Sequence, residues 1–319
     1  MDFSAIAAEL GATQPIEVPA LSTHKGRTLF VDGDMLCYYC AGNDYTTVAA
    51  ARSHARNLLT KMQRACGAER TIIGMTGSWS TKGDRSLVAV TKPYQGTRSG
   101  HKPKNWQYLR DWLVAADNAI VVYDREADDQ AALLAAQANS VDDIVLCSRD
   151  KDFRMIPALH LNWMTMELVR VPRGCYSLTA GEEVFGYKWF LLQMLHGDTV
   201  DGIPGLPSHP SFRRGVGAVA ASTILCLAQD ATAGILAVIE AYKTAYPDTW
   251  ASLFVEQATL LWMRQDTDAS LYDWYHHLPL GVDTEDYAAL ANALDEQGRR
   301  VTELKEEADA INKAASLQD

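Results

Sequence analysis

The chain has 319 residues, 48% of them hydrophobic and 22% charged, so it is long enough to bury a large core. Its 29 basic and 40 acidic residues give a net charge of -11, which taken alone weighs mildly against nucleic-acid binding. No run approaches the roughly 20 apolar residues of a membrane span, and the N-terminus lacks the pattern of a secretory signal. We therefore expect a soluble cytoplasmic protein.

Short apolar runs alternate with helical patterns through the first half of the chain. The runs predicted as strands are Thr28–Asp32, Thr71–Met75, Ala119–Tyr123 and Ile144–Cys147. Helical spacing covers Val48–Cys66, Trp106–Ala116 and Asp128–Ala138. This alternation predicts an α/β fold with a mostly parallel central sheet and helices on both of its faces.

The two ends of the chain are patterned differently. Residues 1–26 form an N-terminal extension, in which we expect a helix and a tether, and residues 27–180 form the α/β core. Strand signals fade after Gly181: an apolar helix is expected over Phe185–His196, and an Ala-rich helix after Gly215 and Gly217. We divide this part into a region at 181–230 and a C-terminal helical region at 231–319, which ends in an amphipathic helix from Glu285.

Acidic residues gather at four points, three of them directly after predicted strands. The clusters are Asp32 and Asp34; Glu126, Asp128 and Asp129; Asp150 and Asp152; and Asp198 and Asp201. Any single pair could be a helix cap or a solvated turn. Functional groups collect at the carboxyl ends of parallel strands, however, and carboxylates brought together there repel one another unless cations neutralise them. Mg²⁺ prefers such oxygen ligands, and two ions can clamp the oxygens of a phosphodiester.

A basic window interrupts this acidic chain between Ser78 and Arg110. Only Asp84 opposes its seven basic residues, which are Lys82, Arg85, Lys92, Arg98, Lys102, Lys104 and Arg110, so the window carries a charge of +6. Such residues attract phosphates, and Tyr94 can stack on an unpaired base. The alternative is a solvated basic loop.

The motifs together resemble the 5′-nuclease superfamily, which includes flap endonucleases and phage 5′→3′ exonucleases. The resemblance runs from about Thr28 to Leu227. It is carried by Phe30-Val31-Asp32-Gly33, Glu126-Ala127-Asp128-Asp129, Ser148-Arg149-Asp150-Lys151-Asp152-Phe153, and Gly197-Asp198-Thr199-Val200-Asp201-Gly202-Ile203-Pro204-Gly205. Tyr94-Gln95-Gly96-Thr97-Arg98 is similar to a further family element. The paired Asp32 and Asp34 look most like the T7-type phage exonuclease.

The resemblance implies a PIN-like core, an arch over residues 78–110 and a helix-two-turn-helix within residues 181–230. It implies that two Mg²⁺ ions, which Mn²⁺ can replace, are held by Asp32, Glu126, Asp128, Asp129, Asp150, Asp152, Asp198 and Asp201. Catalytic roles fall to Arg85, Lys92, Tyr94 and Arg98, and DNA contacts to Lys102, Lys104, Arg213, Arg214, Gly215 and Gly217. K⁺ binding is implied at the helix-two-turn-helix.

The implied activity is a monomeric 5′→3′ exonuclease on double-stranded DNA with flap endonuclease activity, leaving 5′-phosphates. Phage DNA replication, primer removal or host DNA degradation would be its setting, with RNA–DNA hybrids and replication proteins as further partners. Two departures keep alternatives open, since Gln95 stands where relatives have a lysine and Gly77 where they have an aspartate. One alternative is a catalytically weak DNA-binding protein of this fold. Another is a haloacid-dehalogenase-type phosphatase, whose acidic pair Asp32 and Asp34 would imitate.

Overall fold

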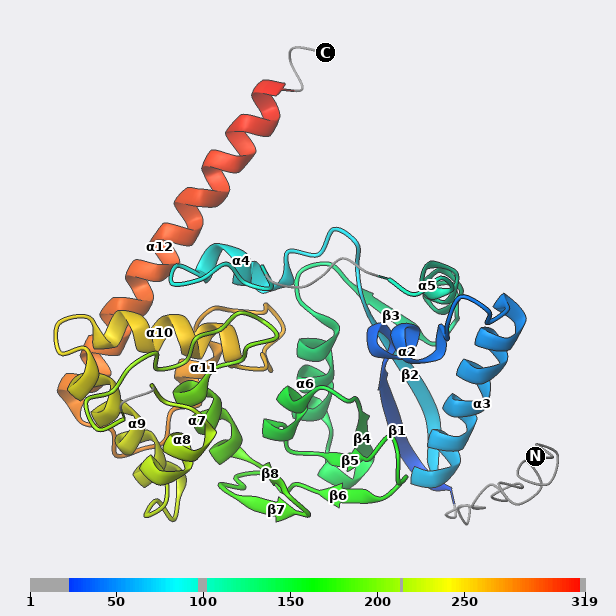
Figure 1. The fold of residues 1–319 in the computed structure, drawn as a ribbon, viewed down its shortest axis with the longest axis horizontal. Helices are drawn as coiled ribbons and strands as arrows, with labels where there is room; N and C mark the ends of the chain where they lie inside the picture. The colour runs from blue at the N-terminus through cyan, green and yellow to red at the C-terminus, as the bar shows by residue number, and fades with distance from the viewer. Residues whose placement is uncertain (1–22, 97–101, 213–214, 316–319) are drawn as a thin grey trace, which may run out of the picture.

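A six-stranded sheet in the order β3-β2-β1-β4-β5-β6 forms the centre of the protein (Figure 1). The computed structural model describes residues 23–96, 102–212 and 215–315. The strands are β1 (His24–Asp32), β2 (Ala68–Thr76), β3 (Ala119–Val122), β4 (Ile144–Cys147), β5 (Leu159–Leu161) and β6 (Leu168–Arg170). Strands β1 to β5 run parallel, and β6 pairs antiparallel with β5. The predicted mostly parallel sheet is confirmed.

Helices cover both faces of the sheet, also as predicted. On one face lie α2 (Gly33–Cys40), α3 (Val48–Cys66) and α5 (Trp106–Val114), and on the other lies α6 (Ala127–Gln137). Strand β1 shows why two layers form, because its side chains alternate between the faces. Leu29 and Val31 pack in the cluster that contains α2 and α3, whereas Phe30 packs in the cluster that contains α6. All three side chains are fully buried.

The second half of the chain is mostly helical. After a hairpin of β7 (Leu178–Ala180) and β8 (Glu183–Phe185) come α7 (Tyr187–His196), α8 (Ala218–Ile224), α9 (Ala231–Ala245), α10 (Trp250–Leu261), α11 (Asp273–His276) and α12 (Thr284–Ala315). The buried cluster of Phe30 and Leu146 continues into Phe190 on α7 and Phe254 on α10. One apolar core therefore joins the sheet to the helical half. The end of α12 extends beyond the rest of the molecule (Figure 1).

Several elements differ from the sequence-based expectation. The tether predicted up to residue 26 is wrong at its end, because β1 already begins at His24, and the helix expected further upstream lies outside the described residues. Helix α2 was not predicted, nor were β5, β6, β7 and β8, which have three residues each and are too short to show a period. Where the chain is described, no helix is both long and apolar enough to cross a membrane.

The strand order creates a switch point between β1 and β4. From β1 the chain moves to β2 and β3 on one side, and then returns across the sheet to β4 on the other. Crevices at the carboxyl ends of such neighbouring strands are the usual ligand sites of open α/β sheets. Asp32 ends β1, and Asp150 follows β4 by three residues.

Candidate functional site

The carboxyl ends of β1 and β4 are tied together by a serine. The Ser148 hydroxyl donates to Asp32 Oδ2 at 2.7 Å, and the Asp150 amide donates to Ser148 Oγ at 2.9 Å. Asp32 also begins α2, because its Oδ1 accepts the Met35 amide at 2.9 Å. Asp32 is only 5% exposed, so this carboxylate is fixed in place at the switch point.

A cavity of about 800 Å³ opens at this point, and acidic side chains from all four predicted clusters line it. Its acidic lining comprises Asp32, Asp34, Glu126, Asp128, Asp129, Asp150, Asp152 and Asp201, and its basic lining comprises Lys82, Arg85, Lys102 and Arg110. Two acids are neutralised by arginines: Arg110 lies 2.8 Å from Asp34, and Arg85 lies 2.7 Å from Asp129. Among the residues that the structure describes, eight acidic side chains line the cavity against four basic ones, so this lining carries a negative excess.

Burial and mutual repulsion act strongly on the carboxylates of this cavity. Burial, reinforced by the charges of Asp34 and Asp150, raises the pKa of Asp32 to about 7. Burial and neighbouring carboxylates also raise the pKa values of Asp128 and Asp152 well above their ordinary range, and burial raises the pKa of Asp150. A set of ionised carboxylates is therefore unfavourable here without a compensating cation.

The donor set fits Mg²⁺ better than a softer metal. The cavity offers carboxylate oxygens and no thiolate or imidazole. Across residues 23–96, 102–212 and 215–315, no three His, Cys, Asp or Glu side chains converge closely enough to hold one ion by themselves. Mg²⁺ does not require such a cage, because it keeps several waters and commonly takes one or two carboxylates. The chemistry of the site therefore suits a hydrated divalent cation.

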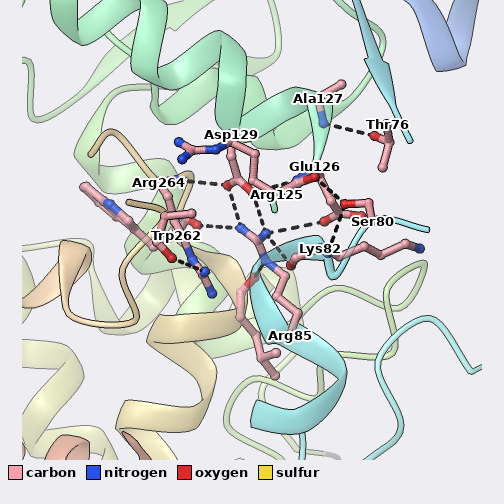
Figure 2. A network of polar contacts seen from close by, with 12 residues as sticks. Thr76, Ser80, Lys82, Arg85, Arg125, Glu126, Ala127, Asp129, Trp262 and Arg264 are labelled. Carbon is pink, nitrogen blue, oxygen red and sulfur yellow. Dashed lines mark hydrogen bonds and ion pairs between the residues drawn. The ribbon is translucent and has the colours of Figure 1, made fainter. Parts of the chain in front are cut away.

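Asp129 and Arg85 form a buried ion pair, and both line the cavity (Figure 2). Arg85 donates to both oxygens of Asp129, at 2.7 and 2.8 Å. Its remaining N–H groups donate to the carbonyls of Leu260, Trp262 and Lys82. Burial raises the pKa of Asp129, but the Arg85 charge and hydrogen bonds outweigh it and hold that pKa below its usual range. These contacts join the basic window to α6 and to the end of α10.

Tyr94 and Gln95 lie inside the cavity against Glu126. The Tyr94 hydroxyl is 2.7 Å from Glu126 Oε2 and 3.1 Å from Asp201 Oδ2, and the Gln95 amide donates to Glu126 Oε1 at 3.1 Å. Burial and the charge of Glu126 raise the pKa of Tyr94 well above its ordinary range. Lys82 completes this group, because its Nζ donates to Gln95 Oε1 at 2.5 Å. Position 95 thus holds an amide that is bonded to a lysine of the same basic window.

Glu256 anchors the middle of the basic window. This buried residue of α10 accepts the amides of Val90 and Thr91 at 2.8 and 2.7 Å, and the Thr91 hydroxyl at 2.6 Å. The described part of the window before residue 97 is therefore fixed to the helical half at Arg85, at Val90 and Thr91, and at Tyr94.

The last acidic cluster sits in a turn that only glycines allow. Asp198 and Ile203 exchange two backbone hydrogen bonds of 2.7 Å, which closes the turn. A Cβ on Gly205, whose φ is +66°, would lie 2.3 Å from the Gly197 nitrogen. Asp198 pairs with Lys151 at 3.1 Å and is absent from the cavity lining, whereas Asp201 lines the cavity.

The other predicted residues are placed as follows. Lys92 and Lys104 are exposed outside the cavity, and Lys102 lies on its rim with Nζ 3.8 Å from the centre of the Trp106 ring. Gly217 begins α8 with open space where a side chain would stand, and Gly215 packs against the Pro207 carbonyl. Arg98, Arg213 and Arg214 lie outside the described residues.

Two supporting residues were missed in the sequence. Gln193, on α7, donates to Asp152 Oδ1 at 2.6 Å, and Ser148 bridges Asp32 to Asp150. Gln193 is 41 positions from its partner and gives no local signal. Ser148 stands directly after a strand and before an acidic pair, and this position could have identified it.

No model of a known protein family matches this chain, and no curated protein matches it significantly.

Proposed function

We propose that this chain is a magnesium-dependent nuclease of the 5′-nuclease type, acting on double-stranded DNA as a 5′→3′ exonuclease and on flaps as an endonuclease. The observation that carries the proposal is the excess of carboxylates in one cavity at the switch point of a parallel sheet. A basic segment lies against that cavity, as a phosphate-binding segment must. The motif resemblance supplies the substrate class.

In this proposal Asp32, Asp128, Asp150 and Asp152 hold the metal, and Glu126 and Asp201 contribute to a second ion. Mg²⁺, when bound, supplies charge that neutralises these carboxylates and polarises the phosphate. In the hydrolysis a water oxygen bonds to phosphorus and the P–O3′ bond breaks. The leaving 3′ oxygen takes up a proton, and the 5′-phosphate stays on the downstream strand. Asp129 and Arg85 fix the start of the basic window, and Ser148 and Gln193 orient Asp32 and Asp152.

The finer features of the fold belong to the same proposal. The core would be PIN-like, the segment over residues 78–110 would arch over the cavity, and α7 with α8 would form a helix-two-turn-helix. Its Gly215–Gly217 entrance would approach the DNA backbone, with K⁺ bound to carbonyls there. Lys102 and Lys104 would follow the phosphates.

The test is cleavage of blunt, nicked and flapped duplexes, labelled at the 5′ end in one series and at the 3′ end in another. We expect Mg²⁺-dependent release of short 5′-labelled products and no cleavage in EDTA. A parallel series uses RNA–DNA hybrids as substrates. Asp150→Asn should abolish cleavage, whereas Asp248→Asn, which changes an exposed carboxylate away from the cavity, should not. Degradation from the 3′ end, or full activity of Asp150→Asn, would overturn the proposal. Binding without cleavage would establish the DNA-binding alternative, and hydrolysis of a simple phosphomonoester alone would establish the phosphatase.

A further inference from the structure

Within residues 23–96, 102–212 and 215–315, four cations line the acidic cavity, and three of them are already engaged. Arg85 donates its N–H groups to Asp129 and to three carbonyls. Arg110 is bonded to Asp34 and to the Thr76 carbonyl, and the Lys102 ammonium stands over the Trp106 ring. Lys82 differs from the two arginines because its partner is the neutral amide of Gln95, and from the exposed Lys102 because it is half-buried. Among the described residues it forms no ion pair, so its full charge faces the cavity.

The backbone that carries Lys82 has an unusual conformation. Lys82, Gly83 and Asp84 have φ angles of 53°, 63° and 62°, so three consecutive residues are left-handed. Such residues other than glycine cost about 1–3 kcal/mol each, and they persist where the surroundings impose them. Left-handed conformation normally occurs at single residues, so a run of three requires strong external support.

That support comes from several directions. The Lys82 amide donates to Ser80 Oγ at 3.1 Å, and the Gly83 amide donates to the Asp124 carbonyl at 2.9 Å. Asp84 pairs with Lys305 of α12 at 2.6 Å. The Arg264 guanidinium lies against Gly83, where an added Cβ would stand 2.3 Å from Nη1. Backbone groups and neighbours thus hold the turn, and the Lys82 side chain is left to reach Gln95 inside the cavity.

We propose that Lys82 is a catalytic residue of the hydrolysis, with its ammonium contacting a nonbridging oxygen of the scissile phosphate. The inference rests on the proposed nuclease function. In this role Lys82 donates hydrogen bonds and charge where negative charge builds up on the phosphate in the transition state. Gln95, bonded to Glu126 and to Lys82, holds the ammonium beside the carboxylates.

The experiment compares wild type, Lys82→Gln, Lys82→Arg and a matched control, Lys61→Gln, which changes an exposed lysine of α3. Three quantities are measured: the dissociation constant for a flapped duplex in Ca²⁺, the single-turnover cleavage rate in Mg²⁺, and stability to urea. We expect Lys82→Gln to lower the cleavage rate about 10²- to 10³-fold, as when one transition-state donor is removed. The dissociation constant and the stability should stay near wild type, because backbone groups hold the turn. Lys82→Arg should recover part of the rate.

The outcomes separate the two proposals. Wild type that fails to cleave any of the substrates overturns the nuclease function and this role with it. If wild type cleaves and Lys82→Gln cleaves at a rate within about threefold of the wild-type rate, the role of Lys82 is overturned and the nuclease function is not. A rate loss matched by an equal loss of binding or of stability would show that Lys82 acts in affinity or folding, and would also overturn the proposal.

Discussion

Replacing Asp32 by asparagine should make the metal-free protein more stable, although the residue lies at the centre of the cavity. Burial and the charges of Asp34 and Asp150 raise the pKa of Asp32 to about 7, against an ordinary value of 3.8. Ionisation of Asp32 therefore opposes folding. Asparagine has nearly the same shape, stays neutral, and keeps an oxygen that can accept the Met35 amide.

The sign and size of the effect follow from proton linkage. The folded protein holds the Asp32 proton up to a higher pH than the unfolded chain does, so stability falls as pH rises from about 4 to about 7. A pKa that is higher by about three corresponds to about 4 kcal/mol lost above pH 7. We expect Asp32→Asn to recover up to that amount at about pH 8 in EDTA, and less at about pH 5.

The measurement is urea unfolding of both proteins across this pH range, with and without Mg²⁺. A buried histidine also contributes to the dependence of each protein's stability on pH, because burial lowers the pKa of His160 to about 4. The unfolded chain then binds the extra proton, and stability rises with pH between about 4 and 6.5. His160 is common to both proteins, so the difference between their curves removes its contribution.

Added Mg²⁺ should reverse the order of stability, so that wild type becomes more stable to urea than Asp32→Asn. Because a cation binds the ionised carboxylates, it should stabilise wild type most at high pH and Asp32→Asn much less. The reasoning is refuted if Asp32→Asn is less stable than wild type at about pH 8 in EDTA. Equal stabilisation of the two proteins by Mg²⁺ would contradict the metal assignment of Asp32.

Three further predictions concern the supports of the site. Arg85→Ala leaves the buried charge of Asp129 without its partner and should cost about 3–5 kcal/mol in urea unfolding. A cost below about 1 kcal/mol, the value of an exposed pair, would contradict the buried clamp. Glu256→Gln weakens the charge-assisted bonds to the basic window and should cost about 1–3 kcal/mol, with faster proteolysis after Val88; unchanged proteolysis would argue against anchoring. Gly205→Ala requires a left-handed alanine that meets the Gly197 backbone, and should cost more than about 1 kcal/mol and weaken Mg²⁺ stabilisation.

Much of the sheet was predictable because β1 and β4 contain short apolar runs whose side chains are buried on both faces. β4 was located to the residue, and all four of its side chains are buried. The same pattern placed the acidic clusters, because a parallel sheet gathers the carboxyl ends of its strands at one edge. Asp32 and Asp150 thus met in the structure although 118 positions separate them in the chain.

The roles of individual acids could not be predicted in this way. Asp128 and Asp129 are neighbours of the same type, yet one faces the cavity among carboxylates and the other is clamped by Arg85. The helix turns by about 100° between them, and their partners come from segments distant in sequence. Arg85 was predicted to contact the substrate because the sequence shows its charge. The sequence does not show the five acceptor atoms to which Arg85 donates in the folded protein.

Under the proposed function, the division of charge in the cavity would reconcile an acidic chain with an anionic substrate. Arginines neutralise Asp34 and Asp129, and these pairs hold the walls in place. The remaining carboxylates would repel a phosphate as strongly as they repel one another. Under the proposed function, a divalent cation must therefore enter before the DNA, and it converts the cavity from a repulsive to an attractive one. The basic window alone could hold a strand near the cavity, but only the cation together with Lys82 could draw a phosphate into it.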